Sequence, residues 1–415
     1  MTSYILPIHF QRKRDKNLKH SKIDEIAGSY KFSKDIVEGI NNIYGKRTER
    51  ILIALKKPNS KYFIRVNTLK SDSEEVIRNL MQKGIEVYRH DMIEEAIFLP
   101  TKGPFELPKT EMKITADKYA AESVIQGANL YAPGVINCHG LRKNQRVTVV
   151  DEFGEAVGVG IAQMSENEVL ALRRGIAVEV TDSVYYIPTL RESREFELGY
   201  IYPQSLPAMI TSRILDPRPG EEIIDICAAP GGKTSHLAQL MENNGQIVAV
   251  DKNKTKVHKL LNTLIRLGIK NTQVICHDAR YLDIDFPTLK ANKVLVDPPC
   301  SSLGVRPKLF DYTSTEEINS LAEYQKQILK TASKIVKLGG IVVYSTCTLT
   351  IEENEEVIKY AIENCNLELI EEKKFCFGSP GIQRAFNKAT LAQRFEPDVH
   401  EDCQGYFIAK MERKR

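Results

Sequence analysis

The chain contains 415 residues, which is enough for about two or three domains of ordinary size. Its 42% apolar and 27% charged residues are typical of a globular protein with a sizeable core. The formal net charge is only +4, so any binding of nucleic acid must depend on local basic patches and not on overall charge.

The N-terminus does not resemble a signal peptide. The apolar stretch at residues 4–8 is too short, and basic residues follow it instead of preceding it. No run approaches the ~18 apolar residues of a membrane helix, so the sequence predicts a cytoplasmic protein without a membrane partner. The basic residues form a cluster that is either a solvated terminus or a nucleic-acid contact: Arg12, Lys13, Arg14, Lys16, Lys19 and Lys22.

The eight cysteines are scattered without regular spacing and form no C-x-x-C pair. This pattern argues against a disulfide framework and against a structural zinc site, so no metal is expected.

In chain order, residues 1–108 are predicted to form a small α/β region. Helical spacing runs through residues 32–55, a strand is expected at residues 62–67, a helix at residues 73–83, and a strand around Val87. Ser71 or Ser73 can cap the helix, with Glu74 and Glu75 in its first turn.

Residues 109–187 show a different pattern of predicted elements, with short strands separated by turns. A short helix at residues 116–126 precedes short strands at residues 146–150, 156–162 and 177–180, separated by turns. Short, regularly spaced strands favour a small β-barrel inserted in the chain.

Residues 188–415 alternate between strands and helices. Strands are expected at residues 222–226, 246–250, 272–276, 293–296 and 340–345, and a last strand at 405–410 that can enter antiparallel. This alternation predicts an α/β fold with a doubly wound, mostly parallel sheet.

The first strand of this region runs into a small-residue loop at the start of a helix: Cys227, Ala228, Ala229, Pro230, Gly231, Gly232, Lys233 and Thr234. Ligands of open α/β sheets bind at the carboxyl ends of the strands, where Asp251, Asp278 and Asp297 also lie. A carboxylate about 20 residues beyond the glycines suits ribose hydroxyls, so the sequence predicts a nucleoside-type cofactor. A P-loop would need glycine at position 227, and a G-x-G-x-x-G motif is absent.

Two cysteines, Cys300 and Cys347, follow the fourth and fifth predicted strands. Free cysteines are usually buried and inert, but a position just past a strand end lies at the ligand-binding edge. The two thiols are therefore candidates for chemistry at the same edge as the cofactor loop.

The motifs at 227–234, 297–301 (Asp-Pro-Pro-Cys-Ser) and 345–348 (Ser-Thr-Cys-Thr) resemble those of the Nop/Sun family of RNA 5-methylcytosine methyltransferases. Residues 65–70, 353–355 and 405–407 are similar to further motifs of that family. The resemblance implies a seven-stranded methyltransferase sheet, S-adenosylmethionine as cofactor and S-adenosylhomocysteine as product.

The resemblance also implies roles for single residues. Cys347 is the expected nucleophile toward carbon 6 of cytosine, which activates carbon 5, and Cys300 is expected to promote product release. Asp297 and Lys233 lie close to the chemistry. DNA cytosine-C5 enzymes use the Pro-Cys cysteine for attack, so this assignment depends on the family and not on spacing. The expected cofactor contacts are the loop from Cys227 to Lys233, Asp251, Lys256, Asp278 and Asp297.

Residues 120–135 and 157–162 are similar to a PUA domain, and a PUA insertion resembles the branch of the family that methylates tRNA in the acceptor stem near the CCA end. The candidate phosphate contacts are Lys143, Arg146, Arg173 and Arg174. A monomer is expected. Two alternatives stay open, a methyltransferase acting on ribosomal RNA and a non-catalytic RNA-binding assembly factor.

Overall fold

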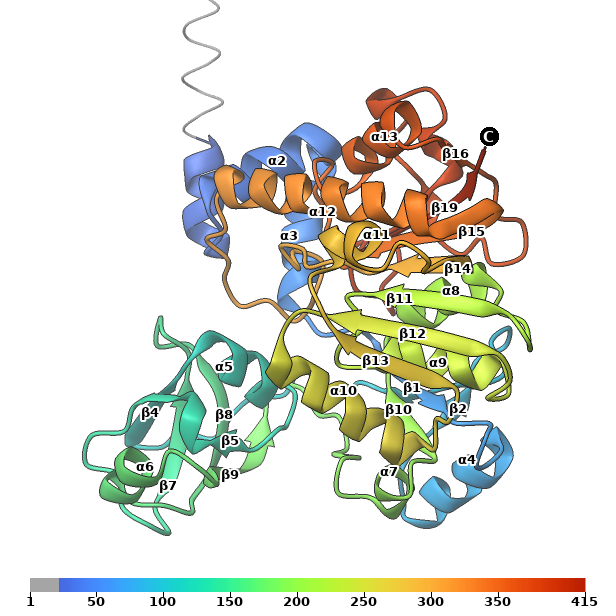
Figure 1. The fold of residues 1–415 in the computed structure, drawn as a ribbon. Coiled ribbons are helices and arrows are strands. Elements are labelled where there is room, and N and C mark those ends of the chain that lie inside the picture. Colours follow the sequence, from blue (N-terminus) through green and yellow to red (C-terminus); the bar gives the residue numbers. More distant parts are fainter. Residues whose placement is uncertain (1–21, 415) are drawn as a thin grey trace, which may run out of the picture.

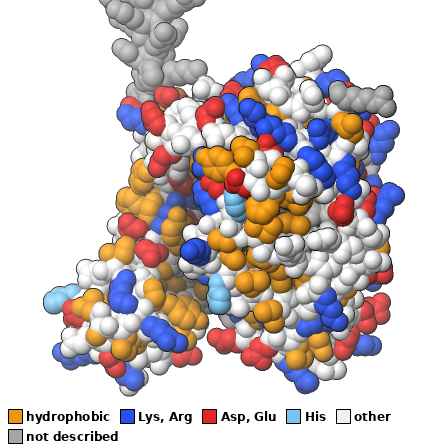
Figure 2. Space-filling model, in the orientation of Figure 1, with side chains coloured by type: hydrophobic (Ala, Val, Ile, Leu, Met, Phe, Trp, Pro, Cys, Tyr) orange, Lys and Arg blue, Asp and Glu red, His pale blue; other side chains and the backbone are white. Residues whose placement is uncertain are grey.

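The computed structural model describes residues 22–414, so five of the six predicted basic-cluster residues lie outside the described part and only Lys22 is inside it. Figure 1 shows a large α/β body with a smaller β-rich domain beside it. Along this face the surface is hollowed between the two (Figure 2). None of the helices within residues 22–414 is long and apolar enough to cross a membrane.

The described chain begins with helices packed on the large body. A helix at residues 22–30 is followed by α2 (Lys34–Tyr44) and α3 (Thr48–Lys56). The Ser33 hydroxyl accepts from the Ile36 amide and caps α2, whose buried residues recur at helical spacing. This apolar face packs with Leu303 and Leu349 of the large body.

The N-terminal sheet has the order β10-β1-β3-β2, from Ile201–Pro203, Lys61–Val66, Ala96–Pro100 and Tyr88–Arg89. Helix α4 (Ser73–Gln82) covers it, and its cap is Asp72 and not Ser71 or Ser73, because the Asp72 carboxylate accepts from the Glu75 amide. Strand β10 follows the inserted domain in sequence, yet it pairs antiparallel with β1. The chain thus returns to the N-terminal sheet before it enters the sheet of the large body.

The inserted domain is a six-stranded sheet of order β5-β9-β8-β7-β4-β6 that packs against one apolar cluster. Its elements are β4 (Met112–Ala116), α5 (Lys118–Val124), β5 (Leu130–Tyr131), β6 (Val135–Asn137), β7 (Arg146–Val150), β8 (Ala156–Ala162), α6 (Glu166–Leu172) and β9 (Ile176–Ser183). Strands β8 and β9 approach so closely at Gly160 that a Cβ there would lie 2.1 Å from the Glu179 carbonyl oxygen.

The large body contains the predicted doubly wound, mostly parallel sheet. Strands β13 (Thr272–Cys276), β12 (Gln246–Asp251), β11 (Glu222–Ile226), β14 (Ala291–Val296) and β15 (Val336–Thr346) pair in parallel in that order. Strand β19 (Tyr406–Arg413) adds antiparallel to β15, as the sequence allowed.

Within residues 22–414 the sheet has nine strands, two more than the seven that the family resemblance implied. Six of the nine were located from the sequence, and the other three are the short elements β16 (Leu367–Leu369), β17 (Ser379–Pro380) and β18 (Gln393–Phe395). Two or three residues leave no recognisable alternation in a sequence.

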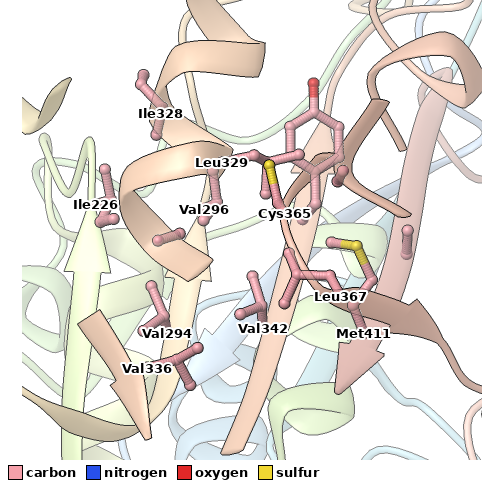
Figure 3. Close-up of a cluster of buried hydrophobic side chains, with 14 of the residues drawn as sticks. Ile226, Val294, Val296, Ile328, Leu329, Val336, Val342, Cys365, Leu367 and Met411 are labelled. Atoms are coloured by element: carbon pink, nitrogen blue, oxygen red, sulfur yellow. The ribbon is translucent and has the colours of Figure 1, made fainter. Parts of the chain in front are cut away.

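Helices cover both faces of the sheet. On one face, Ile328 and Leu329 of α12 (Thr315–Ile335) pack on Ile226, Val296 and their neighbours (Figure 3), beside α11 (Leu282–Asp285) and α13 (Glu355–Asn364). On the other face lie α8 (Leu206–Leu215), α9 (Gly232–Leu240) and α10 (Lys254–Leu267). Because both faces are buried, the carboxyl edge of the strands is left to hold a ligand.

Candidate active site

Two adjoining cavities lie at the carboxyl edge of the sheet and meet at Cys227. One is lined by the loop after β11, together with Tyr202, Gln204, Asp225 and Asp297. The other is lined by Asp251, Lys252, Lys256, His277 and Tyr324, among others. Two cavities that share a lining residue suit an extended ligand with a nucleoside at one end.

The loop between β11 and α9 turns sharply through two residues of positive φ, Cys227 (66°) and Gly231 (104°). The Ala228 amide donates to the Val250 carbonyl at 2.9 Å, which ties the loop to β12. A Cβ on Gly232 would lie 2.9 Å from the Tyr202 ring, so glycine is needed for this close approach. Of the predicted loop residues, all except Gly231 line one of the cavities.

Lys233 and Asp297 form a part-buried ion pair that lines the first cavity. Lys233 Nζ lies 2.7 Å from Asp297 Oδ2, and the Ser345 hydroxyl donates to Asp297 Oδ1 at 3.0 Å. Burial alone would lower the pKa of Lys233, but the Asp297 carboxylate and the Tyr406 hydroxyl raise it above its ordinary value. Lys233 is therefore a charged ammonium held against the Asp297 carboxylate.

The two predicted cysteines lie side by side, with Cys300 Sγ 3.4 Å from Cys347 Sγ. The Ser302 hydroxyl is 3.5 Å from the Cys347 sulfur. The hydrogen bond with Cys300 lowers the pKa of Cys347, helped by Ser302 and Lys233 and opposed by burial. The same bond and burial raise the pKa of Cys300 well above its ordinary value. The lowered pKa makes Cys347 the better thiolate of the pair, with the Cys300 thiol placed to donate to it.

A buried network holds the turn that carries Cys300. The Glu353 carboxylate, fully buried, accepts from the Ser301 amide at 2.8 Å and from the Ser301 hydroxyl at 2.6 Å. Gln325 Nε2 donates to Glu353 and to the Pro299 carbonyl, and the Tyr344 hydroxyl donates to the Glu353 carbonyl. The network fixes the backbone at Cys300 relative to the end of β15.

Three cofactor contacts were predicted between the 227–233 loop and Asp297, namely Asp251, Lys256 and Asp278, and they differ in position. Asp251 accepts from the Ala229 amide at 3.3 Å and the Asn253 amide at 3.0 Å, and it faces the second cavity, as does Lys256. Asp278 lines neither cavity, and Arg280 engages both of its carboxylate oxygens. The structure therefore brings together the predicted residues except Gly231 and Asp278, which line neither cavity.

Several residues at the site were not predicted. Tyr202 and Gln204 reach it from the N-terminal sheet, and Ser302, Ser345 and Tyr406 surround the ion pair and the sulfurs. The Ser-Thr-Cys-Thr motif at 345–348 contains Ser345 and the Gly-Tyr-Phe motif at 405–407 contains Tyr406, so these two had a sequence signal although no role was predicted for them. Among residues 22–414 no group of three or more His, Cys, Asp or Glu side chains could hold a metal ion.

Family models match three segments of the chain. They are described as 16S rRNA methyltransferase RsmB/F (residues 212–412), a PUA domain (112–184) and the ferredoxin-like domain of RsmF/B-like methyltransferases (34–106). The chain is 44% identical to the tRNA (cytosine(72)-C(5))-methyltransferase of Pyrococcus horikoshii, over 92% of this chain and 96% of that protein. This chain belongs to the Nop/Sun family of RNA cytosine-C5 methyltransferases.

Two further similarities agree with that membership. The chain is 28% identical to the tRNA (cytosine(72)-C(5))-methyltransferase NSUN6 of Mus musculus, over 88% of this chain and 90% of that protein. The crystal structure of NSun6 from Pyrococcus horikoshii with SFG superposes with a TM-score of 0.85 at 42% identity, covering 93% of this chain and 99% of that one. As a member of the Nop/Sun family, the protein is an S-adenosylmethionine-dependent RNA methyltransferase with a PUA domain, as the sequence predicted.

The predicted phosphate contacts on the PUA domain are not equivalent. Arg173 donates to the carbonyls of Val135 and Pro133, and Arg146 pairs with Asp182 at 3.2 Å. Arg173 is thus engaged in holding its own domain together, which leaves Lys143 and Arg174 as the stronger candidates for phosphate contact.

Proposed function

We propose that this enzyme methylates carbon 5 of a cytosine near the 3′ end of tRNA, with Cys347 as the covalent nucleophile. The observation that carries the proposal is the placement of two contacting thiols near the Lys233–Asp297 pair, which itself lines the first cavity. The tRNA substrate is supported by the relatives that match both the catalytic and the PUA regions, which are named as tRNA methyltransferases.

The cavities fit S-adenosylmethionine. The 227–233 loop and Asp297 would hold the amino-acid end, and Asp251 and Lys256 the ribose end. Asp225 Oδ1 is buried at the first cavity without a hydrogen-bond partner, which leaves an acceptor for a ligand or for water. We infer a smaller contribution from Asp278, because Arg280 already occupies its oxygens.

The reaction begins with the Cys347 thiolate, which adds to carbon 6 of the cytosine. The displaced electron pair moves onto the ring toward N3, where the Lys233–Asp297 pair supplies a proton or shares one, so that carbon 5 becomes nucleophilic. The bound cofactor supplies the methyl group that carbon 5 takes up.

Release needs a base to remove the proton from carbon 5. The electron pair of that C–H bond then restores the double bond between carbons 5 and 6, Cys347 leaves as a thiolate, and the proton taken up at N3 returns to the Lys233–Asp297 pair. The Cys300 thiol, 3.4 Å away, donates a hydrogen bond to the leaving sulfur and so lowers the barrier to departure.

The test is methyl transfer from S-adenosylmethionine by the purified protein to tRNA and to fragments of ribosomal RNA, with the product position read by bisulfite sequencing. A single methylated cytosine close to the 3′ end of tRNA supports the proposal. Preferential methylation of ribosomal RNA would replace the substrate, and no methylation of any RNA would favour a non-catalytic assembly factor. A monomeric state, a cytoplasmic location and the division into residues 1–108, 109–187 and 188–415 are parts of the same proposal.

A further inference from the structure

Residues 302–313, which we name the strap, connect the two sulfurs with the inserted domain. The strap follows the Pro-Pro-Cys motif and contains no helix or named strand. It runs from Ser302, beside the Cys347 sulfur, to Asp311, whose backbone pairs with residues 31–33 of the N-terminal helices.

The first part of the strap is fixed to the catalytic site. The Gly304 amide donates to the Cys347 carbonyl at 2.9 Å, and the Gly405 amide donates to the Gly304 carbonyl at 2.8 Å. A Cβ on Gly304 would lie 2.1 Å from the Gly405 carbonyl oxygen, so no side chain fits between the two backbones. Displacement of the strap at this point would move the nucleophile's own backbone.

The far part of the strap is fixed to the inserted domain. The side chains of Leu309 and Phe310 are only 8% exposed and belong to the apolar cluster of that domain. The Phe310 ring meets Phe153 edge to face, with centroids 5.0 Å apart. The Leu309 amide also donates to Glu122 Oε1 of α5 at 3.0 Å.

A buried ion pair reinforces this attachment. Asp311 Oδ2 lies 3.1 Å from Lys118 Nζ of the inserted domain and 3.0 Å from Lys308 Nζ of the strap itself. Burial opposes ionisation of Asp311, but the Lys308 ammonium, with Lys118 and Thr313, lowers its pKa to about 2. The ion pair is therefore present throughout the working pH range.

We propose that the strap is a positioning device, which sets the distance between the RNA end held by the inserted domain and the Cys347 sulfur, with Phe310 and Asp311 as its positioning residues. This inference rests on the proposed function. Domains joined through small interfaces normally move relative to one another. A nucleophile must be placed within a fraction of an ångström, so an anchored strap would let an end-bound RNA present one cytosine only.

The test combines strap variants of the full-length enzyme with a change in the RNA. Phe310→Ala removes the apolar anchor, and Asp311→Asn removes the ion pair with little change of shape. Phe375→Ala is the matched control, because Phe375 is also 8% exposed but belongs to the catalytic core. Each protein is assayed at saturating concentration on an intact tRNA and on the same tRNA without its CCA end, and tRNA affinity is measured separately.

The strap account predicts a non-additive result. On intact tRNA, Phe310→Ala should lower kcat about tenfold or more while the Kd for tRNA stays within about threefold, because the end is still held but the base is misplaced. On truncated tRNA, Phe310→Ala and the unchanged enzyme should differ by less than about threefold, since neither uses the anchor. Asp311→Asn should show the same pattern with a smaller loss, and it remains informative if thermal melting shows that Phe310→Ala does not fold. Phe375→Ala should lower activity on both RNAs by the same factor.

Equal losses on intact and truncated tRNA for both strap variants would overturn the proposal, because the strap would then act only through the stability of the active site. A different outcome identifies failure of the proposed function. If the unchanged enzyme methylates both RNAs equally well, the inserted domain does not bind the CCA end. The strap could then not set the distance between that end and Cys347.

Discussion

At the scale of single residues, the reactivity of Cys347 depends on groups with opposing effects. The hydrogen bond with Cys300 lowers its pKa most, burial raises it, and the Ser302 hydroxyl lowers it further. Lys233 also lowers the pKa of Cys347, whereas Asp297 raises it. The net shift is downward, so more of the sulfur is thiolate at neutral pH than in an ordinary cysteine.

This balance predicts the pH dependence of methyl transfer. Activity needs the thiolate, so kcat/KM should rise with pH through a pKa below the usual value of about 8.5 for cysteine. Ser302→Gly removes one stabilising hydroxyl, and glycine tolerates the φ of 56° at this position. The rising limb should then move to higher pH, while calorimetry should show unchanged cofactor affinity. A profile that does not move would mean that Ser302 has no effect on the nucleophile.

Asp251 gives a second prediction at this scale. A carboxylate that accepts from ribose hydroxyls contributes roughly 1.5–3 kcal/mol through charge-assisted hydrogen bonds. Asp251→Ala should therefore weaken S-adenosylmethionine binding about tenfold or more. Asp283→Ala is the control, because Asp283 pairs with Lys334 and lines neither cavity. If calorimetry gives the same Kd for Asp251→Ala as for the control, the ribose is bound elsewhere.

At the scale of elements, the N-terminal sheet is joined to the catalytic helices by a buried polar seam. Arg65 of β1, 1% exposed, donates to the Gly232 carbonyl at 2.7 Å and to the Ser235 hydroxyl at 2.7 Å. Glu95 lies between Arg213 of α8 and His236 of α9, with His236 Nε2 2.7 Å from Glu95 Oε1. The seam ties the N-terminal sheet to the helix that begins at the cofactor loop.

The seam predicts a loss of stability in acid. Burial lowers the pKa of His236 to about 4, so the folded protein keeps this imidazole neutral, whereas the unfolded chain protonates it below about pH 6.5. Between these values the unfolded state binds more protons, and the free energy of unfolding falls as pH falls, by up to about 1.4 kcal/mol per pH unit. His236→Gln should reduce that slope in urea unfolding from pH 6.5 to 4. His258→Gln, on an exposed part of α10, is the control, and equal slopes for both variants would refute the assignment.

The elements at the active site could be predicted because their contacts follow from local sequence. The strands β11, β12, β14 and β15 each end at or just before an acidic residue or a cysteine. Because these strands are parallel, their carboxyl ends meet at one edge of the sheet. The pairing of β10 with β1, the Arg65 seam and the strap could not be predicted, because each joins segments more than 100 residues apart. The Asp72 cap was missed because the neighbouring serines are equally good caps.

At the scale of the whole molecule, the inserted domain and the catalytic body share one structural element. Leu309 and Phe310 belong to the catalytic region in sequence, but their side chains pack in the apolar cluster of the inserted domain. A deletion of residues 109–187 would expose these two side chains to water. We therefore expect the deletion to need Leu309→Ser and Phe310→Ser for good solubility.

That deletion should keep S-adenosylmethionine binding within a few-fold, because the deleted residues line neither cavity, yet it should methylate tRNA poorly. Calorimetry and a methyl-transfer assay measure the two properties separately. Full activity on tRNA in the deletion variant would show that the PUA domain does not position the substrate.

We expect that Cys347 becomes bonded to the RNA and that Cys300 assists its release. To test this, Cys300→Ala is incubated with tRNA and S-adenosylmethionine, the products are separated on a denaturing gel, and any protein–RNA bond is mapped by peptide mass spectrometry. A denaturant-resistant adduct should form at Cys347 with little turnover, and it should be absent from Cys300→Ala/Cys347→Ala. An adduct at another residue, or substantial turnover by Cys347→Ala alone, would contradict this expectation.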